Sequence, residues 1–155
     1  MQIIKDKAII EDNWVHYCGE GDLPEGNIIV SLDLWQEMDL SGRNIGLQLE
    51  PDDMLSDIKD DLHHFDLIAI NFPTFADGRG YSMAKILRDR LGYKKEIRAV
   101  GDVMRDQLFY LQRCGFNAFE IKAGRDIVDA LEAFEDFSVK YQTSSDEDVP
   151  LYRRQ

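Results

Sequence analysis

The sequence predicts a single α/β domain, residues 1–137, in which about four successive βα units with parallel strands follow a small N-terminal cap that contains β-strands. From residue 45 onward, short apolar runs alternate with stretches whose apolar residues recur at helical spacing. Two of these stretches end alike, with Arg-Leu-Gly-Tyr at 90–93 and Arg-Cys-Gly-Phe at 113–116, directly before an apolar run. An open parallel sheet and a half-barrel-like curl both fit this pattern.

Residues 1–44 do not follow the βα alternation. Short strands are expected at Ile3–Ile4, Ala8–Ile10 and Ile28–Leu32. The Gly-containing segments at 19–22 and 24–27 predict turns. We interpret residues 1–44 as a cap or an added sheet on the same domain.

Residues 45–137 supply the βα repeats. The expected strands are Ile45–Leu49, Leu67–Ile70, Ile97–Val100 and Ala118–Ile121. The helices that follow them have apolar stripes at Met54, Leu55, Ile58 and Leu62, at Met83, Ile86, Leu87 and Leu91, at Met104, Leu108 and Leu111, and at Ile127, Leu131 and Phe134. Pro51 suits the first position of a helix, and Gly92 and Gly115 suit C-terminal caps. Residues 138–155 lack periodicity and are expected to form a flexible tail with acidic and basic residues.

The charge of the chain restricts its partners. Its 155 residues carry a formal net charge of −12, which repels nucleic-acid phosphates and anionic membrane surfaces and favours contact with a basic protein face. No apolar run reaches the ~20 residues of a membrane span, and the charged N-terminal segment does not resemble a signal peptide. Cys18 and Cys114 do not form a disulfide framework. We therefore expect a reduced, cytoplasmic protein.

Two polar loops, Phe72–Ser82 and Gly101–Gln107, are the predicted working surface. Ligands of parallel α/β proteins bind beyond the carboxyl ends of the strands, where these loops and a third at 123–126 are expected. Each loop contains an Arg beside an Asp. The candidate ligand-binding residues are Arg79, Gly80, Tyr81, Ser82, Arg105, Gln107 and Arg125, and the candidate acid–base residues are Asp77, Asp102 and Asp106. Such a set suits a small oxyanion, but the Arg and Asp side chains could equally pair and only brace the loops.

The sequence contains no motif that indicates a cofactor or a metal. It has neither a Walker loop nor a dinucleotide fingerprint, and it lacks the Cys set of an iron–sulfur cluster. His63 with His64, or His16 with Cys18, supplies too few ligands for a zinc site. Cys114 is expected at a helix C-terminus, where the dipole disfavours a thiolate, so we interpret it as a buried structural thiol. We predict no cofactor and no metal.

Four segments of the chain resemble an uncharacterised bacterial family, domain-of-unknown-function family 934. They read FPTFADGRGYS at 72–82, LRDRLGY at 87–93, RAVGDVMRDQ at 98–107 and RCGFNAFE at 113–120. The resemblance runs from about Asp12 to Ile121. Members of that family are described as oxidoreductases involved in sulfite reduction. The resemblance therefore implies a place in assimilatory sulfur metabolism, with sulfite reductase or another sulfur-assimilation enzyme as the partner.

The sequence leaves three functions open. The first is an accessory protein or oxidoreductase component of sulfite reduction, acting on or beside the reductase. The second is a small α/β enzyme that binds an anion or a phosphorylated metabolite at the Arg–Asp loops. The third is a structural or oligomerising domain without catalysis. A homo-oligomer is compatible with all three.

Overall fold

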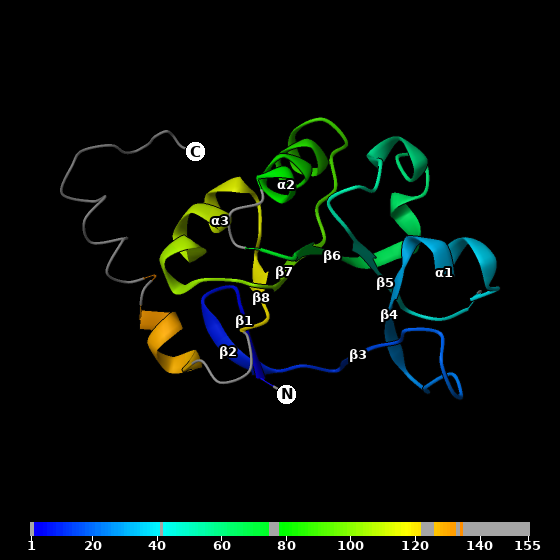
Figure 1. The fold of residues 1–155 in the computed structure, drawn as a ribbon, viewed down its shortest axis with the longest axis horizontal. Helices are drawn as coiled ribbons and strands as arrows, with labels where there is room; N and C mark the ends of the chain where they lie inside the picture. Colours follow the sequence, from blue (N-terminus) through cyan, green and yellow to red (C-terminus); the bar gives the residue numbers. More distant parts are fainter. Residues whose placement is uncertain (1, 41, 75–77, 122–125, 133, 135–155) are drawn as a thin grey trace.

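The computed structural model of the protein describes residues 2–40, 42–74, 78–121, 126–132 and 134. It contains one eight-stranded sheet with helices along one face (Figure 1). The strands are β1 (Gln2–Lys5), β2 (Ala8–Glu11), β3 (Trp14–His16), β4 (Asn27–Ser31), β5 (Ile45–Leu49), β6 (Phe65–Phe72), β7 (Glu96–Gly101) and β8 (Ala118–Phe119). The helices are α1 (Leu32–Glu37), α2 (Arg79–Asp89) and α3 (Leu108–Cys114), with 3-10 turns at Leu55–Asp57, Leu62–His64 and Arg105–Gln107.

The strand order confirms the predicted α/β class with parallel strands. In the sheet the order is β2-β1-β8-β7-β6-β5-β4-β3. Strands β3 to β8 are parallel to one another, and β1 is antiparallel to both of its neighbours, β8 and β2. The three strands expected in residues 1–44 are present as β1, β2 and β4, although Leu32 already belongs to α1, and β3 was not expected. All four strands belong to the same sheet and extend it at both edges.

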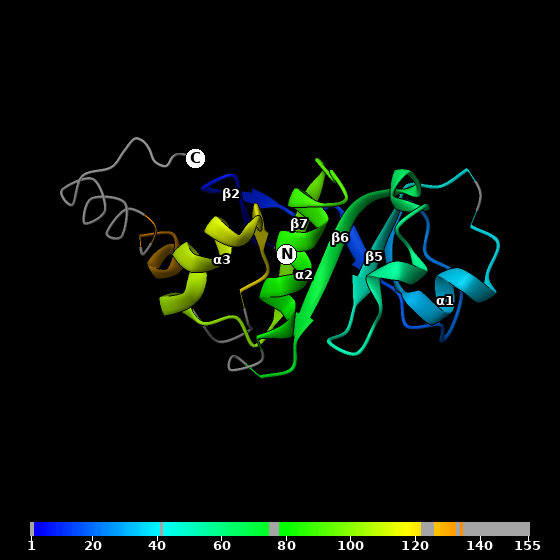
Figure 2. The same ribbon diagram turned by 90° about the horizontal axis from the view of Figure 1, so that it is seen from above.

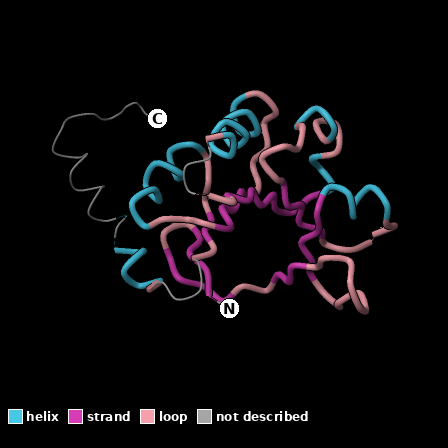
Figure 3. The backbone as a smooth tube through the Cα atoms, viewed as in Figure 1, coloured by secondary structure: helices cyan, strands magenta, loops and turns pink. Residues whose placement is uncertain are grey.

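The connection between β2 and β3 shows why the sheet is curled. These two strands are the opposite edges of the sheet, yet only Asp12 and Asn13 separate them in the sequence. Seven strand spacings of ~4.8 Å would place the edges of a flat sheet about 34 Å apart, whereas the three steps from Glu11 to Trp14 span at most about 11 Å. The sheet consequently bends into a half-barrel with the helices outside the curve (Figure 3). Of the two predicted alternatives, the half-barrel is the one adopted.

The two faces of the sheet have different compositions because side chains alternate along each strand. The convex face and the helices enclose the main core, which includes Leu47, Ile68, Ile70, Ile97 and Phe119. The concave face has a small apolar cluster of Ile29, Leu67, Ala69 and Val100, with Trp14 packed against it. Polar and charged side chains occupy much of the rest of this inner face.

The helices match the predicted stripes and caps along most of the chain. Helices α2 and α3 lie next to one another on the convex face (Figure 2). Gly92 follows α2 at φ +70° and Gly115 ends α3 at φ +122°, which are conformations that favour glycine. The described residues 127–132 and 134 are also helical, as predicted. No helix in these described ranges is long and apolar enough to cross a lipid bilayer.

The segment between β5 and β6 differs from the prediction. A helix was expected after Pro51, but the chain forms two separate 3-10 turns, Leu55–Asp57 and Leu62–His64. Ile58 and Leu62 are buried, whereas Met54 is 61 % exposed, so the expected apolar stripe does not pack as a unit. Five of the residues from 52 to 61 are Asp, a residue that forms helices poorly in interior positions. The predicted tail at 138–155 lies outside the described residues.

Candidate functional site

The two predicted arginines that can be placed lie at the carboxyl edge of the sheet and form exposed ion pairs. Arg79 Nη1 lies 2.6 Å from Asp52 Oδ1, and the two side chains are 59 % and 89 % exposed. Arg105 Nε lies 2.9 Å from Asp129 Oδ2, with exposures of 44 % and 54 %. Asp52 follows β5 and Asp129 belongs to the last helical segment, so these pairs brace different connections. Asp77 and Arg125 lie outside the described residues.

Two other predicted residues of the Phe72–Ser82 loop, Gly80 and Tyr81, have packing contacts. Gly80 is buried, and a Cβ there would lie 2.6 Å from the Phe72 ring, so the glycine allows α2 to approach β6 closely. The Tyr81 ring lies 5.3 Å from that of Phe72 and 5.2 Å from that of Tyr110, and burial raises the pKa of its phenol. Ser82 is exposed.

The Gly101–Gln107 loop borders a small cavity. Asp102 N donates to Phe72 O over 2.7 Å, which ties the end of β7 to the end of β6. Asp106 and Gln107 lie in the 3-10 turn that precedes α3. A cavity of about 220 Å³ adjoins this loop, and its lining residues are Val103, Arg105, Ile121, Asp126, Asp129 and Ala130. Arg105 is thus a predicted binding residue that lines a cavity.

The concave face carries a charge network that the sequence analysis did not identify. Its centre is Arg98, which projects from β7 and is 1 % exposed. Arg98 Nη1 and Nη2 donate to the two carboxylate oxygens of Asp12 over 2.8 and 3.0 Å. Arg98 Nε donates to Glu96 Oε2 over 2.8 Å, and Nη1 also donates to Glu120 Oε2 over 2.9 Å. One guanidinium therefore joins β7 to the β2–β3 connection and to the residue after β8.

Two further groups complete this set, which we call the Arg98 network: Lys5, Asp12, His16, Glu96, Arg98 and Glu120. Lys5 Nζ lies 3.0 Å from Glu96 Oε1, and His16 Nε2 lies 2.8 Å from Glu120 Oε2. Burial alone would lower the pKa of Arg98, but its three carboxylate partners outweigh burial and raise it. Burial alone would raise the pKa of Glu120, but His16 and Arg98 outweigh burial and lower it. Both groups are therefore charged at neutral pH.

A second cavity, of about 270 Å³, lies at the carboxyl ends of β3, β4 and β5. We call it the His16 cavity, and its lining residues are His16, Tyr17, Cys18, Ile29, Val30, Ser31, Leu34 and Gln48. Ser31 Oγ accepts a hydrogen bond from Leu34 N. Gln48 Nε2 donates to Glu50 Oε2 over 3.0 Å, and Asn71 Nδ2 donates to Glu50 Oε1 over 2.8 Å. This arrangement places polar groups from three neighbouring strands at the ligand-binding end of the sheet.

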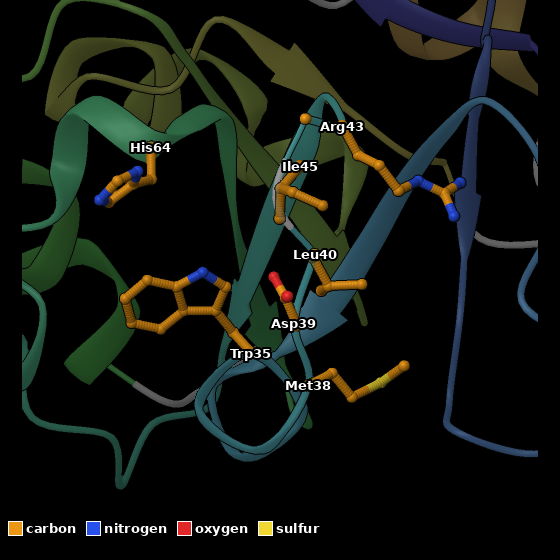
Figure 4. Close-up of a pocket in the computed structure, with 8 residues that line it drawn as sticks. Trp35, Met38, Asp39, Leu40, Arg43, Ile45 and His64 are labelled. Carbon is orange, nitrogen blue, oxygen red and sulfur yellow. The ribbon is translucent and has the colours of Figure 1, made fainter.

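A third cavity lies at the opposite end of the sheet, next to the start of β5. It measures about 300 Å³ and is lined by Trp35, Met38, Asp39, Leu40, Gly42, Arg43, Ile45 and His64. Figure 4 shows Trp35 and His64 on one side of it and Arg43 on the other, with the guanidinium directed away. That guanidinium donates to the carbonyl oxygens of Pro24 and Gly26. The amino ends of the strands are the less favourable location for a ligand in this fold.

Cysteines and histidines are dispersed over the described part of the chain. No group of three or more His, Cys, Asp or Glu side chains there could hold a metal ion. Cys114 is buried, and burial raises the pKa of its thiol, in agreement with a structural role. Cys18 is exposed and lines the His16 cavity.

The Arg98 network had one signal in the sequence. Glu96 and Arg98 interrupt an otherwise apolar strand, and charged residues are almost never fully buried unless they are paired. That pattern predicts buried acidic partners for Arg98. It does not identify Asp12 or Glu120, because neither lies near Arg98 in the sequence.

Comparison with known protein families gives a match. The sequence profile of the family described as "Bacterial protein of unknown function (DUF934)" matches residues 46–152. The matched region includes Arg98 and Glu120, whereas Asp12 and His16 precede it. No curated protein sequence matches the chain at a significant level.

Proposed function

The chain belongs to the DUF934 family of bacterial proteins, and from this membership we propose that it serves assimilatory sulfite reduction in the cytoplasm as an accessory protein or oxidoreductase component that acts on or beside the reductase. The resemblance of its four central segments to proteins described in that role supports the proposal. So does the net charge of −12, which favours docking on a basic protein face.

The observation that carries the proposal is the exposure of the Arg79–Asp52 and Arg105–Asp129 ion pairs at the carboxyl edge. An exposed pair contributes only roughly 0–1 kcal/mol, because water screens both charges. Either arginine can therefore exchange its internal Asp for a carboxylate of a partner protein or for an oxyanion at small cost. A buried pair could not exchange in this way.

Affinity purification from cells grown on sulfate tests the accessory role. We expect a sulfur-assimilation enzyme to co-purify with the native chain, and less of it to co-purify with Arg79→Ala and Arg105→Ala. The matched control is Arg90→Ala, which removes an exposed arginine outside both loops. If no such enzyme is recovered, and deletion of the gene leaves growth on sulfate unchanged, the role in sulfite reduction is wrong.

The cavity beside Arg105 favours a second candidate, a small enzyme that binds an anion or a phosphorylated metabolite. Thermal unfolding with millimolar sulfite, sulfate or phosphate tests it. Stabilisation of the native chain that is lost in Arg105→Ala and kept in Arg90→Ala would support it. If no anion stabilises the native chain and every variant grows normally on sulfate, the ion pairs only brace the fold.

A further inference from the structure

The concave face holds a histidine whose surroundings resemble those of a catalytic base. His16 Nε2 lies 2.8 Å from Glu120 Oε2, and the same oxygen accepts from Arg98 Nη1 over 2.9 Å. A base held by a carboxylate that is itself fixed by a third group is the arrangement that activates histidine in many hydrolases. Asp12, bound to the same guanidinium, has a side chain that is 1 % exposed.

The direction of the hydrogen bond defines which nitrogen of His16 can react. Glu120 is charged, since His16 and Arg98 lower its pKa against the opposing effect of burial. An ionised carboxylate only accepts hydrogen bonds, so in the neutral form of His16 the proton lies on Nε2 and Nδ1 keeps its lone pair. The imidazole lines the His16 cavity, and its side chain is 39 % exposed. The neutral imidazole of this lining residue therefore has Nδ1 as the nitrogen that can accept a proton.

The cavity restricts the class of ligand. Its volume of about 270 Å³ suits a molecule smaller than most drug-sized ligands. Ile29, Val30 and Leu34 supply an apolar wall, and Ser31 and Gln48 supply polar groups. The Arg98 network contains three carboxylates against two permanent cations, Arg98 and Lys5. This excess of negative charge disfavours an anion. The apolar wall disfavours a charged ligand of either sign, so an uncharged ligand fits the cavity best.

We propose that the His16 cavity is an acid–base site for a small uncharged metabolite, with His16 as the catalytic base and Glu120 as its positioning residue. His16 Nδ1 takes a proton either from an O–H or S–H group of the ligand or from a water molecule that attacks it. The imidazolium that forms is stabilised by Glu120, and it returns the proton to the product or to water. This site is separate from the Arg79 and Arg105 loops, and it does not depend on a role in sulfite reduction.

Hydrolysis of 4-nitrophenyl acetate provides the test, because this ester is small, uncharged and partly apolar. In the proposed step His16 Nδ1 removes a proton from water, the water oxygen bonds to the carbonyl carbon, and the bond to 4-nitrophenolate breaks, leaving acetate. General bases contribute roughly 10²–10⁴-fold to such reactions. We expect His16→Ala to lower the rate constant by roughly 10²-fold, and Glu120→Gln to lower it at least roughly tenfold, with partial recovery in Glu120→Asp.

Two controls separate the proposal from general reactivity and from misfolding. The double variant His63→Ala/His64→Ala removes the other two histidines and should leave the rate unchanged. When each rate is divided by the rate of the same ester with free imidazole, which corrects for the different leaving groups, the anionic ester 4-acetoxybenzoate should react more slowly with the native chain than the uncharged ester. Circular dichroism should show that each variant remains folded.

A spectroscopic measurement tests the positioning role of Glu120 without any substrate. Long-range ¹H–¹⁵N correlation spectra should show the proton of neutral His16 on Nε2 in the native chain and a mixture of tautomers in Glu120→Gln. The inference is overturned if the proton lies on Nδ1 in the native chain. It is also overturned if His16→Ala, in a folded protein, hydrolyses the uncharged ester as fast as the native chain.

Discussion

Replacing Arg98 with Met would remove the guanidinium on which three carboxylates of the concave face converge. Met keeps much of the side-chain volume, so the change mainly deletes charge and hydrogen bonds. Asp12, Glu96 and Glu120 have side chains that are 1 %, 7 % and 15 % exposed, and each lies within 2.9 Å of the guanidinium. In Arg98→Met, water could therefore hydrate the carboxylates of Glu96 and Glu120 only in part, and that of Asp12 hardly at all.

The size of the effect follows from the cost of an unpaired buried charge. Removing one partner of a buried ion pair costs about 3–5 kcal/mol, against a total stability of about 5–15 kcal/mol for a domain of ordinary size. We therefore expect the free energy of unfolding to fall by about 3–5 kcal/mol at pH 7. Since the freed carboxylates can regain stability by binding protons, the loss should shrink when the pH is lowered to 5.

Urea unfolding followed by tryptophan fluorescence measures this loss, because Trp14 packs against the concave cluster. The matched control is Arg90→Met, an exposed arginine for which we expect a change within about 0.5 kcal/mol. Combining Arg98→Met with Asp12→Asn should recover part of the stability. A loss below about 1 kcal/mol for Arg98→Met, or one that is the same at pH 5 and pH 7, would refute the reasoning.

Three further predictions concern stability. The pKa of Glu120 is lowered in the fold. Its contribution to the free energy of unfolding is therefore present above the ordinary value of 4.5 and is lost as the pH falls through the lower folded value. The urea midpoint should consequently fall less steeply between pH 6 and pH 3 in Glu120→Gln than in the native chain, and equal slopes would contradict this. Gly101 has φ +91°, and a Cβ there would lie 2.4 Å from Asn71 Oδ1. Gly101→Ala should therefore lower the free energy of unfolding by roughly 1–3 kcal/mol, and an unchanged urea midpoint would contradict this prediction. Tyr93→Phe leaves the buried Phe65 O without its 3.1 Å hydrogen bond and should cost about 0.5–1.5 kcal/mol by thermal unfolding, whereas no change would show that water replaces the hydroxyl.

The parts of the fold that were predictable from the sequence are those determined by local patterns. Strand Leu67–Ile70 was predicted from its apolar run, and β6 contains it. Gly92 and Gly115 predicted the ends of two helices because the chain needs a positive φ there. The helix expected after Pro51 does not form. It was predicted from apolar spacing alone, which does not account for the poor helix propensity of the Asp residues in that segment.

The candidate site was less predictable because its members come from distant parts of the chain. Arg79 and Arg105 were identified from loops, where local sequence suffices, and the structure places both at the expected edge. His16 and Glu120 are 104 positions apart, and their contact depends on the curl of the whole sheet. The sequence analysis left that curl undecided, so it could not bring these two residues together.

The pairing of β1 with β8, which completes the curled sheet, has a consequence for protein synthesis. Strand β1 leaves the ribosome before the other seven strands of the sheet, yet its partner β8 is not made until residues 118–119. Until then β1 and β2 can form only a hairpin, which is at best marginally stable in isolation. Pairings between segments so far apart in the sequence also form slowly. The nascent chain therefore stays an open sheet, with the edge of β7 unpaired and prone to associate with other chains, until β8 and Glu120 have emerged from the ribosome and the curl can close.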